Sequence, residues 1–261
     1  MVDFHVHTTL SCDGSCTIDE VCRRVIEIGL AAVCFTEHMD FDPADPGYGF
    51  FDYEKYGAQF DEARERYAGK LPVFKGIEVD YQSRFEGEIR DWLTDKEFDL
   101  VLGSVHYVDG VMLSVESLSG KDLDQVYLRY LEEVRLSAES GLFGAIGHFD
   151  YVKKFTGDAF YLDSSERLRP ALERALRAII ESGAALEVST KGLVGKSRDY
   201  RPSLRIVRRY RRLGGRKVTT GSDAHDCQVV GMGMARLQKI CEKLGLRVVT
   251  TPAEIGPRPA P

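Results

Sequence analysis

The chain contains six histidines, and each lies at or just beyond the C-terminal end of a short apolar segment. They are His5, His7, His38, His106, His148 and His225. Imidazole is the commonest metal ligand that a side chain supplies. A lone histidine is usually a packed or surface residue, but six at equivalent positions are hard to obtain by chance. We therefore interpret them as one metal-binding set.

Carboxylates follow the same pattern along the chain. Glu78 closes an apolar segment, Asp223 stands two residues before His225, and Asp13 lies in the loop after the first segment. A carboxylate can bridge two cations, whereas an imidazole cannot, so Glu78 and Asp223 are candidates for holding metals near each other. Glu37 and Asp3 are interpreted as groups that orient the ring nitrogens of the histidines.

The candidate ligands are too many for one ion and suit two or three divalent metal ions. They are His5, His7, Asp13, His38, Glu78, His106, His148, Asp223 and His225. A mixed histidine and carboxylate set favours Zn, Mn or Fe over Mg or Ca, which prefer oxygen ligands. Clustered divalent metals lower the pKa of a bound water toward neutrality and hold oxygens on which charge builds. The set therefore predicts metal-dependent hydrolysis.

Strand-like and helix-like segments alternate along the chain. We expect strands at residues 2–6, 31–36, 73–79, 100–105, 144–147, 185–188 and 218–220, with a weak one at 246–250. Helical patterns cover residues 17–29, 53–67, 88–96, 122–140, 164–182, 202–213 and 235–244. This alternation predicts parallel βαβ units, and 261 residues suit one α/β barrel. We expect a single domain at residues 1–250 and a loose tail at 251–261.

This architecture would bring the candidate ligands together. The C-terminal ends of barrel strands converge on one face, where such enzymes keep their active sites. His5 and His7 are two residues apart, so on a regular strand both side chains point to the same side.

Composition limits the partners. The formal net charge of −6 argues against nucleic acid, which needs a basic surface. It does not exclude a phosphate substrate, because bound metals are positive charges that the count omits. We expect no signal peptide, no membrane span and a cytoplasmic location. The cysteines lack CxxC spacing, so we expect reduced thiols, although Cys12, Cys16 and Cys227 lie beside candidate ligands. The sequence does not indicate an oligomeric state.

The ordered motifs resemble the PHP (polymerase and histidinol phosphatase) superfamily, and most closely its stand-alone histidinol-phosphatases. The matching segments are His5-Val6-His7, Thr36-Glu37-His38, Glu78, His106, Gly147-His148 and Ser222-Asp223-Ala224-His225. They span positions 5 to 225, which is most of the chain. The resemblance implies a distorted (β/α)7 TIM-like barrel with a trinuclear metal site.

The resemblance also implies a division of the ligands. His5, His7, Glu78 and Asp223 would hold the first metal, and Glu78 would bridge to a second held by His106 and His148. Asp13, His38 and His225 would serve the third, although many family members have a histidine where Asp13 stands. Glu78, Asp223 and His225 are the predicted catalytic residues.

Basic residues are dense between Arg198 and Lys217. Leu204, Val207, Tyr210 and Leu213 recur every three residues there, which indicates an outer helix with a solvated basic face rather than a nucleic-acid patch. Lys191 and Arg198 differ, because they fall in the loop after a predicted strand on the active face. We predict that they bind the phosphate of the substrate.

The leading interpretation is a phosphatase that converts L-histidinol phosphate and water to L-histidinol and phosphate, a step of histidine biosynthesis. The alternatives are a PHP phosphoesterase acting on another sugar, amino-alcohol or nucleotide phosphate, a nuclease, and a non-catalytic metal-binding module. The last would need a coordinatively closed ligand set, which the surplus of carboxylates disfavours.

Overall fold

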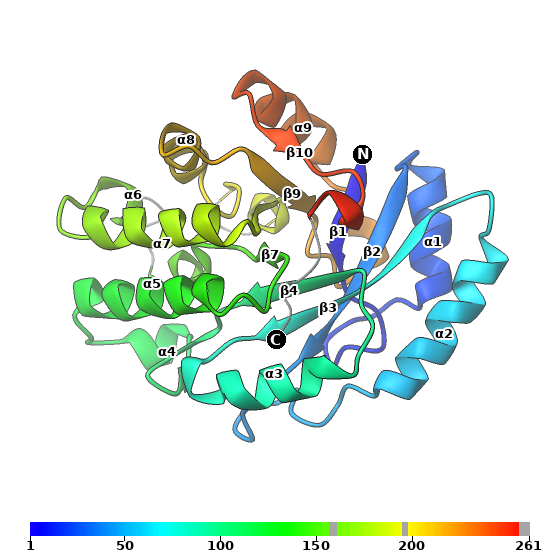
Figure 1. Cartoon of the computed structure of the whole chain (residues 1–261), viewed down its shortest axis with the longest axis horizontal. Helices are drawn as coiled ribbons and strands as arrows, with labels where there is room; N and C mark the ends of the chain where they lie inside the picture. The colour runs from blue at the N-terminus through cyan, green and yellow to red at the C-terminus, as the bar shows by residue number, and fades with distance from the viewer. Residues whose placement is uncertain (157–160, 195–197, 256–261) are drawn as a thin grey trace.

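A curled sheet of parallel strands forms the centre of the computed structural model, which describes residues 1–156, 161–194 and 198–255 (Figure 1). Its strand order is β1-β2-β3-β4-β7-β8-β9-β10. The strands are β1 (Val2–Val6), β2 (Ala32–Met39), β3 (Val73–Asp80), β4 (Leu100–Ser104), β7 (Ala145–Ile146), β8 (Ala185–Ser189), β9 (Lys217–Gly221) and β10 (Arg247–Val248). Every neighbouring pair in this sheet is parallel, as the βα alternation predicts.

The sheet closes on itself at the C-terminal end of its strands. The segment after β9 runs beside β1, where the amide of His7 donates to the carbonyl of Ala224 at 2.9 Å. The amide of Asp223 donates to the carbonyl of His5 at 2.8 Å. Seven strands therefore surround the mouth, and β10 extends the sheet beyond β9. The distorted (β/α)7 barrel predicted from the sequence is confirmed.

Helices cover the outside of the sheet (Figure 1). They are α1 (Ile18–Glu27), α2 (Tyr53–Arg66), α3 (Glu86–Thr94), α5 (Leu123–Glu139), α7 (Arg169–Ser182), α8 (Leu204–Arg212) and α9 (Met234–Lys243), with two short helices, α4 (Val115–Leu118) and α6 (Tyr161–Ser164). A capping box starts α1, since Thr17 and Glu20 bond each other's backbone amides. No helix among the described residues is long and apolar enough to cross a bilayer.

The segment after β4 and the C-terminal residues differ from the expected elements, as do the short helix α4 and the later start of α7. A small hairpin of β5 (Tyr107–Val108) and β6 (Val111–Met112) follows β4, where no element was expected. Strands of two residues are too short to show a period in the sequence. The first residues of the expected tail form a 3-10 turn, η5 (Pro252–Glu254), and Ile255 joins the buried core, while residues 256–261 lie outside the described part.

The barrel interior is apolar at the bottom and polar at the top. Phe4, Cys34, Leu102 and Ala185 belong to one buried cluster near the N-terminal ends of the strands. Further along β2, β4 and β8, the residues of the same parity are polar, as with Glu187 two positions after Ala185. The strand architecture therefore carries polar side chains to the mouth on a packed apolar base.

A β-bulge in β1 sets the direction of the first two histidines. Asp3 pairs with Val33 but Val6 pairs with Phe35, so β1 contains one extra residue between these positions. Phe4 faces the interior cluster, whereas Val6 packs outward with α1 and α2. The bulge changes the alternation between them, and His5 and His7 can therefore both face the mouth.

Candidate metal centre

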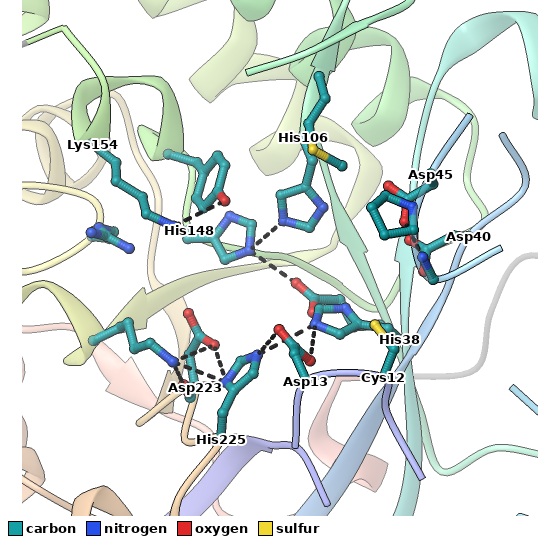
Figure 2. Close-up of a pocket in the computed structure, with 17 residues that line it drawn as sticks. Cys12, Asp13, His38, Asp40, Asp45, His106, His148, Lys154, Asp223 and His225 are labelled. Carbon is teal, nitrogen blue, oxygen red and sulfur yellow. Dashed lines mark hydrogen bonds and ion pairs between the residues drawn. The ribbon is translucent and has the colours of Figure 1, made fainter. Parts of the chain in front are cut away.

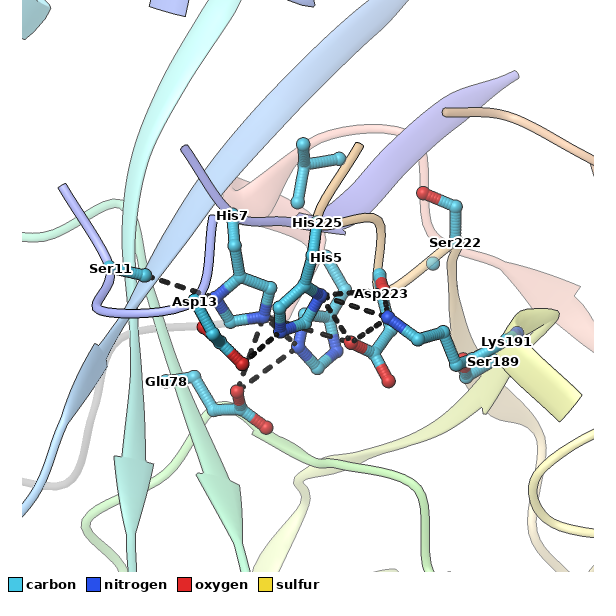
Figure 3. Close-up of polar contacts among 12 residues, drawn as sticks. His5, His7, Ser11, Asp13, Glu78, Ser189, Lys191, Ser222, Asp223 and His225 are labelled. Carbon is cyan, nitrogen blue, oxygen red and sulfur yellow. Dashed lines mark hydrogen bonds and ion pairs between the residues drawn. The ribbon is translucent and has the colours of Figure 1, made fainter. Parts of the chain in front are cut away.

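The predicted ligands meet at the C-terminal mouth of the barrel (Figures 2 and 3). His5 lies on β1 and His7 directly after it, while His38 lies on β2 and Glu78 on β3. The others follow strand ends: Asp13 after β1, His106 after β4, His148 after β7, and Asp223 and His225 after β9. The donor atoms form three groups, and within each group they lie within 4.8 Å of one another. The groups are His5, His7 and Asp223; Glu78, His106 and His148; and His7, His38 and His225.

Imidazole nitrogens approach one another in three separate pairs. The Nε2 atoms are 2.9 Å apart for His5 and His7. They are 3.3 Å apart for His106 and His148, and 3.4 Å apart for His38 and His225. The His106–His148 and His38–His225 pairs join residues far apart in the chain, so local backbone geometry alone does not produce them.

Hydrogen bonds to the Nδ1 atoms of His5 and His7 show which nitrogen of each neutral ring carries the proton. His5 Nδ1 lies 2.6 Å from Glu187 Oε1, so that nitrogen carries the proton and donates it. Ser11 donates its hydroxyl to Glu37 at 2.6 Å, and must therefore accept from His7 Nδ1 at 3.2 Å. With both rings neutral, the two Nε2 lone pairs face each other. A cation between them, either a metal ion or a proton on His5, satisfies this arrangement.

Glu78 lies at the centre of the cluster and is 1% exposed. Its Oε1 lies 2.9 Å from His148 Nε2, while Oε2 lies 3.3 Å from His5 Nε2 and 3.1 Å from His38 Nδ1. Burial opposes its charge, but the charge of His5 and the bonds from His148 and His38 hold the pKa of Glu78 well below its usual value. Its two oxygens face different histidine groups, which is the geometry of a bridging carboxylate.

Asp223 and His225 are held by Lys191. The Lys191 ammonium lies 3.5 Å from Asp223 Oδ1 and 2.9 Å from His225 Nδ1. Burial raises the pKa of Asp223, but Lys191 and His5 lower it to a net value of about 2. Asp223 also has a positive φ of 52°, a conformation that is uncommon outside glycine. Lys191 therefore has a positioning contact in addition to its predicted place on the active face.

Asp13 lies at the outer edge of the centre. Its carboxylate is 54% exposed and contacts His225 Nε2 at 3.1 Å and His38 Nε2 at 3.5 Å. The loop that carries it is fastened to the segment after β9, because the amide and hydroxyl of Ser15 both donate to the carbonyl of His225. The structure thus brings Asp13 to the two histidines with which it was grouped.

Several orienting groups were not predicted from the sequence. Glu187 bonds the His5 ring, and its other oxygen accepts the amide of His148 at 2.7 Å. Asp80 lies 3.2 Å from His106 Nδ1. Both sit on strands next to other ligands, but nothing in their local sequence marks them.

The two orienting groups that the sequence did suggest act differently. Glu37 reaches His7 only through Ser11, and Asp3 accepts backbone amides of Ser222 and Gly231 rather than a histidine ring. Expectation and structure differ because both side chains lie behind the ligand layer.

A cavity of about 510 Å³ opens above the ligands. Three basic side chains line it: Lys154, Lys191 and Arg201. Arg198, the second predicted phosphate-binding residue, is exposed and does not line it. The path of the backbone explains this difference. Ser189 and Arg201 exchange two backbone hydrogen bonds, which bring the chain back to the end of β8 at Arg201. Arg201 is thereby placed at the mouth.

Two carboxylates line the same cavity, Asp40 and Asp45. Burial raises the pKa of Asp40 to about 7, and the neighbouring charge of Asp45 adds to this, whereas His38 opposes it. Asp45 accepts hydrogen bonds from the amide of Gly47 at 2.7 Å and the hydroxyl of Tyr107 at 2.9 Å.

One pair of cysteines contradicts the expectation of reduced thiols. Cys16 and Cys227, 211 residues apart, are paired as a disulfide. Ser15 and His225 already join the two loops, and this proximity allows the pairing. Cys12, Cys22, Cys34 and Cys241 are free.

A barrel whose mouth gathers three groups of metal ligands, beneath a cavity with three basic side chains in its lining, is the architecture of a metal-dependent hydrolase. Comparison with known proteins extends this: the model of the PHP domain family matches residues 3–191. The chain therefore belongs to the PHP domain family.

Individual relatives agree over nearly the whole chain. A probable histidinol-phosphatase of Deinococcus radiodurans is 32% identical over 257 residues, which cover 96% of each protein. One from Thermotoga maritima is 30% identical over 243 residues, covering 93% of this chain and 92% of the relative. The crystal structure of histidinol phosphate phosphatase from Lactococcus lactis, complexed with zinc, L-histidinol and phosphate, matches with a TM-score of 0.85 at 24% identity, over 96% of this chain and 95% of that one.

Proposed function

We propose that the chain is a metal-dependent phosphatase that hydrolyses L-histidinol phosphate to L-histidinol and phosphate. The observation that carries this proposal is the convergence of three imidazole pairs on the carboxylate of Glu78, beneath a cavity lined by basic side chains. The names of the relatives support the choice of substrate.

The donor set fits two to three ions of Zn, Mn or Fe, because each ion assigned below would have both imidazole and carboxylate donors. We assign His5, His7, Asp223 and Glu78 to the first ion, and Glu78, His106 and His148 to the second. Asp13, His38 and His225 are assigned to the third. When bound, such ions lower the pKa of a bound water and offset the charge of phosphate oxygens.

The remaining residues orient the site and the substrate. Glu187 and Ser11 hold the rings of His5 and His7, so their Nε2 atoms keep free lone pairs. Lys154, Lys191 and Arg201 line the cavity and bind the phosphate oxygens, with Arg201 offering a bidentate fork. Glu78, Asp223 and His225 stay the proposed catalytic residues. The cytoplasm stays the predicted location.

Phosphate release tests this proposal. The metal-supplemented chain is compared on L-histidinol phosphate, other phosphomonoesters and a short single-stranded oligonucleotide. We expect a preference for L-histidinol phosphate of at least about a hundredfold in kcat/KM, which is about 3 kcal/mol in transition-state binding. Equal, slow hydrolysis of all esters would contradict the substrate, and cleavage of the oligonucleotide alone would contradict the phosphatase.

A further inference from the structure

The cavity above the metal ligands has walls of opposite charge. Lys154, Lys191 and Arg201 line one side, and Asp40 and Asp45 line the other. Figure 2 shows Lys154 and the two aspartates on opposite sides of the histidine rings. The basic wall suits a phosphate group, but two carboxylates would repel it. The acidic wall must therefore face a different part of the substrate.

Asp40 is the member of this wall that lacks a partner among the described residues. It directly follows β2, two residues beyond His38, and is only 8% exposed. Its carboxylate has no hydrogen-bond or ion-pair partner within the described part of the chain, and it belongs to none of the three ligand groups. Burying a carboxylate without a partner is costly, so such groups are normally paired. The partner that is missing in the protein can come from a ligand, because this carboxylate faces the cavity.

The neighbouring loop keeps this position open. Gly47 lies against both carboxylates, and a Cβ atom there would lie 2.3 Å from Asp40 Oδ2 and 3.2 Å from Asp45 Oδ1. Asp45 is fixed from two sides, by the amide of Gly47 and the hydroxyl of Tyr107. The absence of a side chain at Gly47 thus lets both carboxylates face the same part of the cavity.

We propose that Asp40, with Asp45 beside it, determines specificity by binding a positively charged nitrogen on the alcohol part of the phosphate ester. This inference rests on the phosphatase function proposed above. The phosphate lies against the metal ligands and the basic wall, and the cationic nitrogen lies against Asp40. An ester of a neutral alcohol leaves the buried carboxylate unpaired, which disfavours its binding.

The test compares L-histidinol phosphate with 3-phenylpropyl phosphate, a neutral ester of similar size, on the metal-supplemented chain. In Asp40→Asn we expect the ratio of kcat/KM for the cationic ester over the neutral one to fall at least about tenfold. Gly47→Ala keeps the charge but displaces the carboxylate, so the ratio should fall in the same direction. Asp42→Asn is the matched control, because Asp42 bonds Gln82 and Arg84 and does not line the cavity.

The outcomes separate the two proposals. An unchanged ratio in Asp40→Asn, or equal losses for both esters, would overturn the role of Asp40. Equal hydrolysis of both esters by the unaltered chain would overturn charge selection and leave the phosphatase intact. No phosphate release from either ester would overturn the proposed function itself. L-phenylalaninol phosphate identifies the nitrogen: a parallel loss in Asp40→Asn assigns the ammonium group, and a loss confined to L-histidinol phosphate assigns the imidazole.

Discussion

At the scale of single residues, each ligand is defined by the group behind it. His7 illustrates this, since Ser11 fixes its Nδ1 proton and Glu37 fixes the direction of the Ser11 hydroxyl. Burial and the charges of His38 and His225 hold the pKa of His7 well below its ordinary value. The ring is therefore neutral, as a metal ligand must be.

The histidines could be predicted because each marks a strand end in the sequence. Their orienting partners could not, because a partner is chosen by what lies opposite in space. Glu187 bonds His5 from 182 positions away, and its own segment reads as an ordinary strand. Arg201 was missed for a related reason: the backbone bonds at Ser189 that return the loop to the barrel have no local signature.

Replacing Arg201 and replacing Arg198 should have different effects on phosphate binding. Arg201→Ala removes a buried guanidinium that lines the cavity, so KM for a phosphomonoester should rise at least about tenfold. Arg198→Ala removes an exposed side chain outside the cavity and should leave KM within about twofold. Steady-state kinetics of the two variants check this, and the reverse ranking would restore Arg198 as the phosphate ligand.

Metal binding should release protons. Burial lowers the pKa of His38, but Glu78, Asp13 and Asp40 raise it to a net value of about 9. At neutral pH the ring therefore holds a proton that a cation must displace, and metal affinity should rise with pH until about pH 9. Each displaced proton changes the affinity by about tenfold per pH unit in this range.

Calorimetry of zinc binding in two buffers with different ionisation enthalpies measures that release. The heat should differ between the buffers by at least the equivalent of one proton. His38→Ala should reduce the difference. Identical heats in both buffers for the unaltered chain would contradict the protonated state of His38.

At the scale of elements, the strands position the ligands through small departures from regularity. A regular strand would place His5 and His7 on one side, as their spacing predicted. The structure confirms that both side chains face the mouth. In a regular strand Phe4 would then face outward, and the bulge between Asp3 and Val6 allows Phe4 to face inward as well. Such a bulge depends on the neighbouring strand and leaves no period in the sequence.

Gly221, the last residue of β9, is a second such position. A Cβ atom there would lie 2.4 Å from the Cβ of His5 and 2.7 Å from Glu187 Oε1. Gly221→Ala should therefore displace the His5–Glu187 pair, lower the metal content per chain and reduce kcat/KM at least about tenfold. Metal analysis of the folded variant, with circular dichroism as a check of the fold, measures this.

Gly87→Ala is the matched control. Gly87 lies in α3, and a Cβ atom there would meet nothing within 4 Å. This substitution should leave the metal content unchanged and stabilise the helix slightly. If Gly221→Ala bound metal as Gly87→Ala does, the close contact with His5 would have no role in the centre.

At the scale of the whole molecule, the fold followed from two features of the sequence, the βα alternation and the length. The alternation indicates a parallel barrel because it repeats over the entire chain, and the length suits one such barrel. The hairpin of β5 and β6 and the pairing of Cys16 with Cys227 did not follow. They depend on contacts that only the closed barrel creates, as the separation of 211 residues between the cysteines shows.

The closed barrel also explains why one face carries all the chemistry. The ligands come from both ends of the chain, and the bonds between the His5–His7 segment and the segment around Asp223 bring those ends together. The apolar cluster below them fixes the strands on which they stand. The whole fold is therefore needed to assemble the centre.

The most direct test of this account measures bound metal and phosphate release on the same samples. The purified chain is analysed with L-histidinol phosphate as isolated, after chelation, and after zinc or manganese is returned. We predict two to three divalent ions per chain, loss of activity with loss of metal, and recovery of both together. Undiminished phosphate release from the chelated chain, or no release with two or more ions bound, would contradict it.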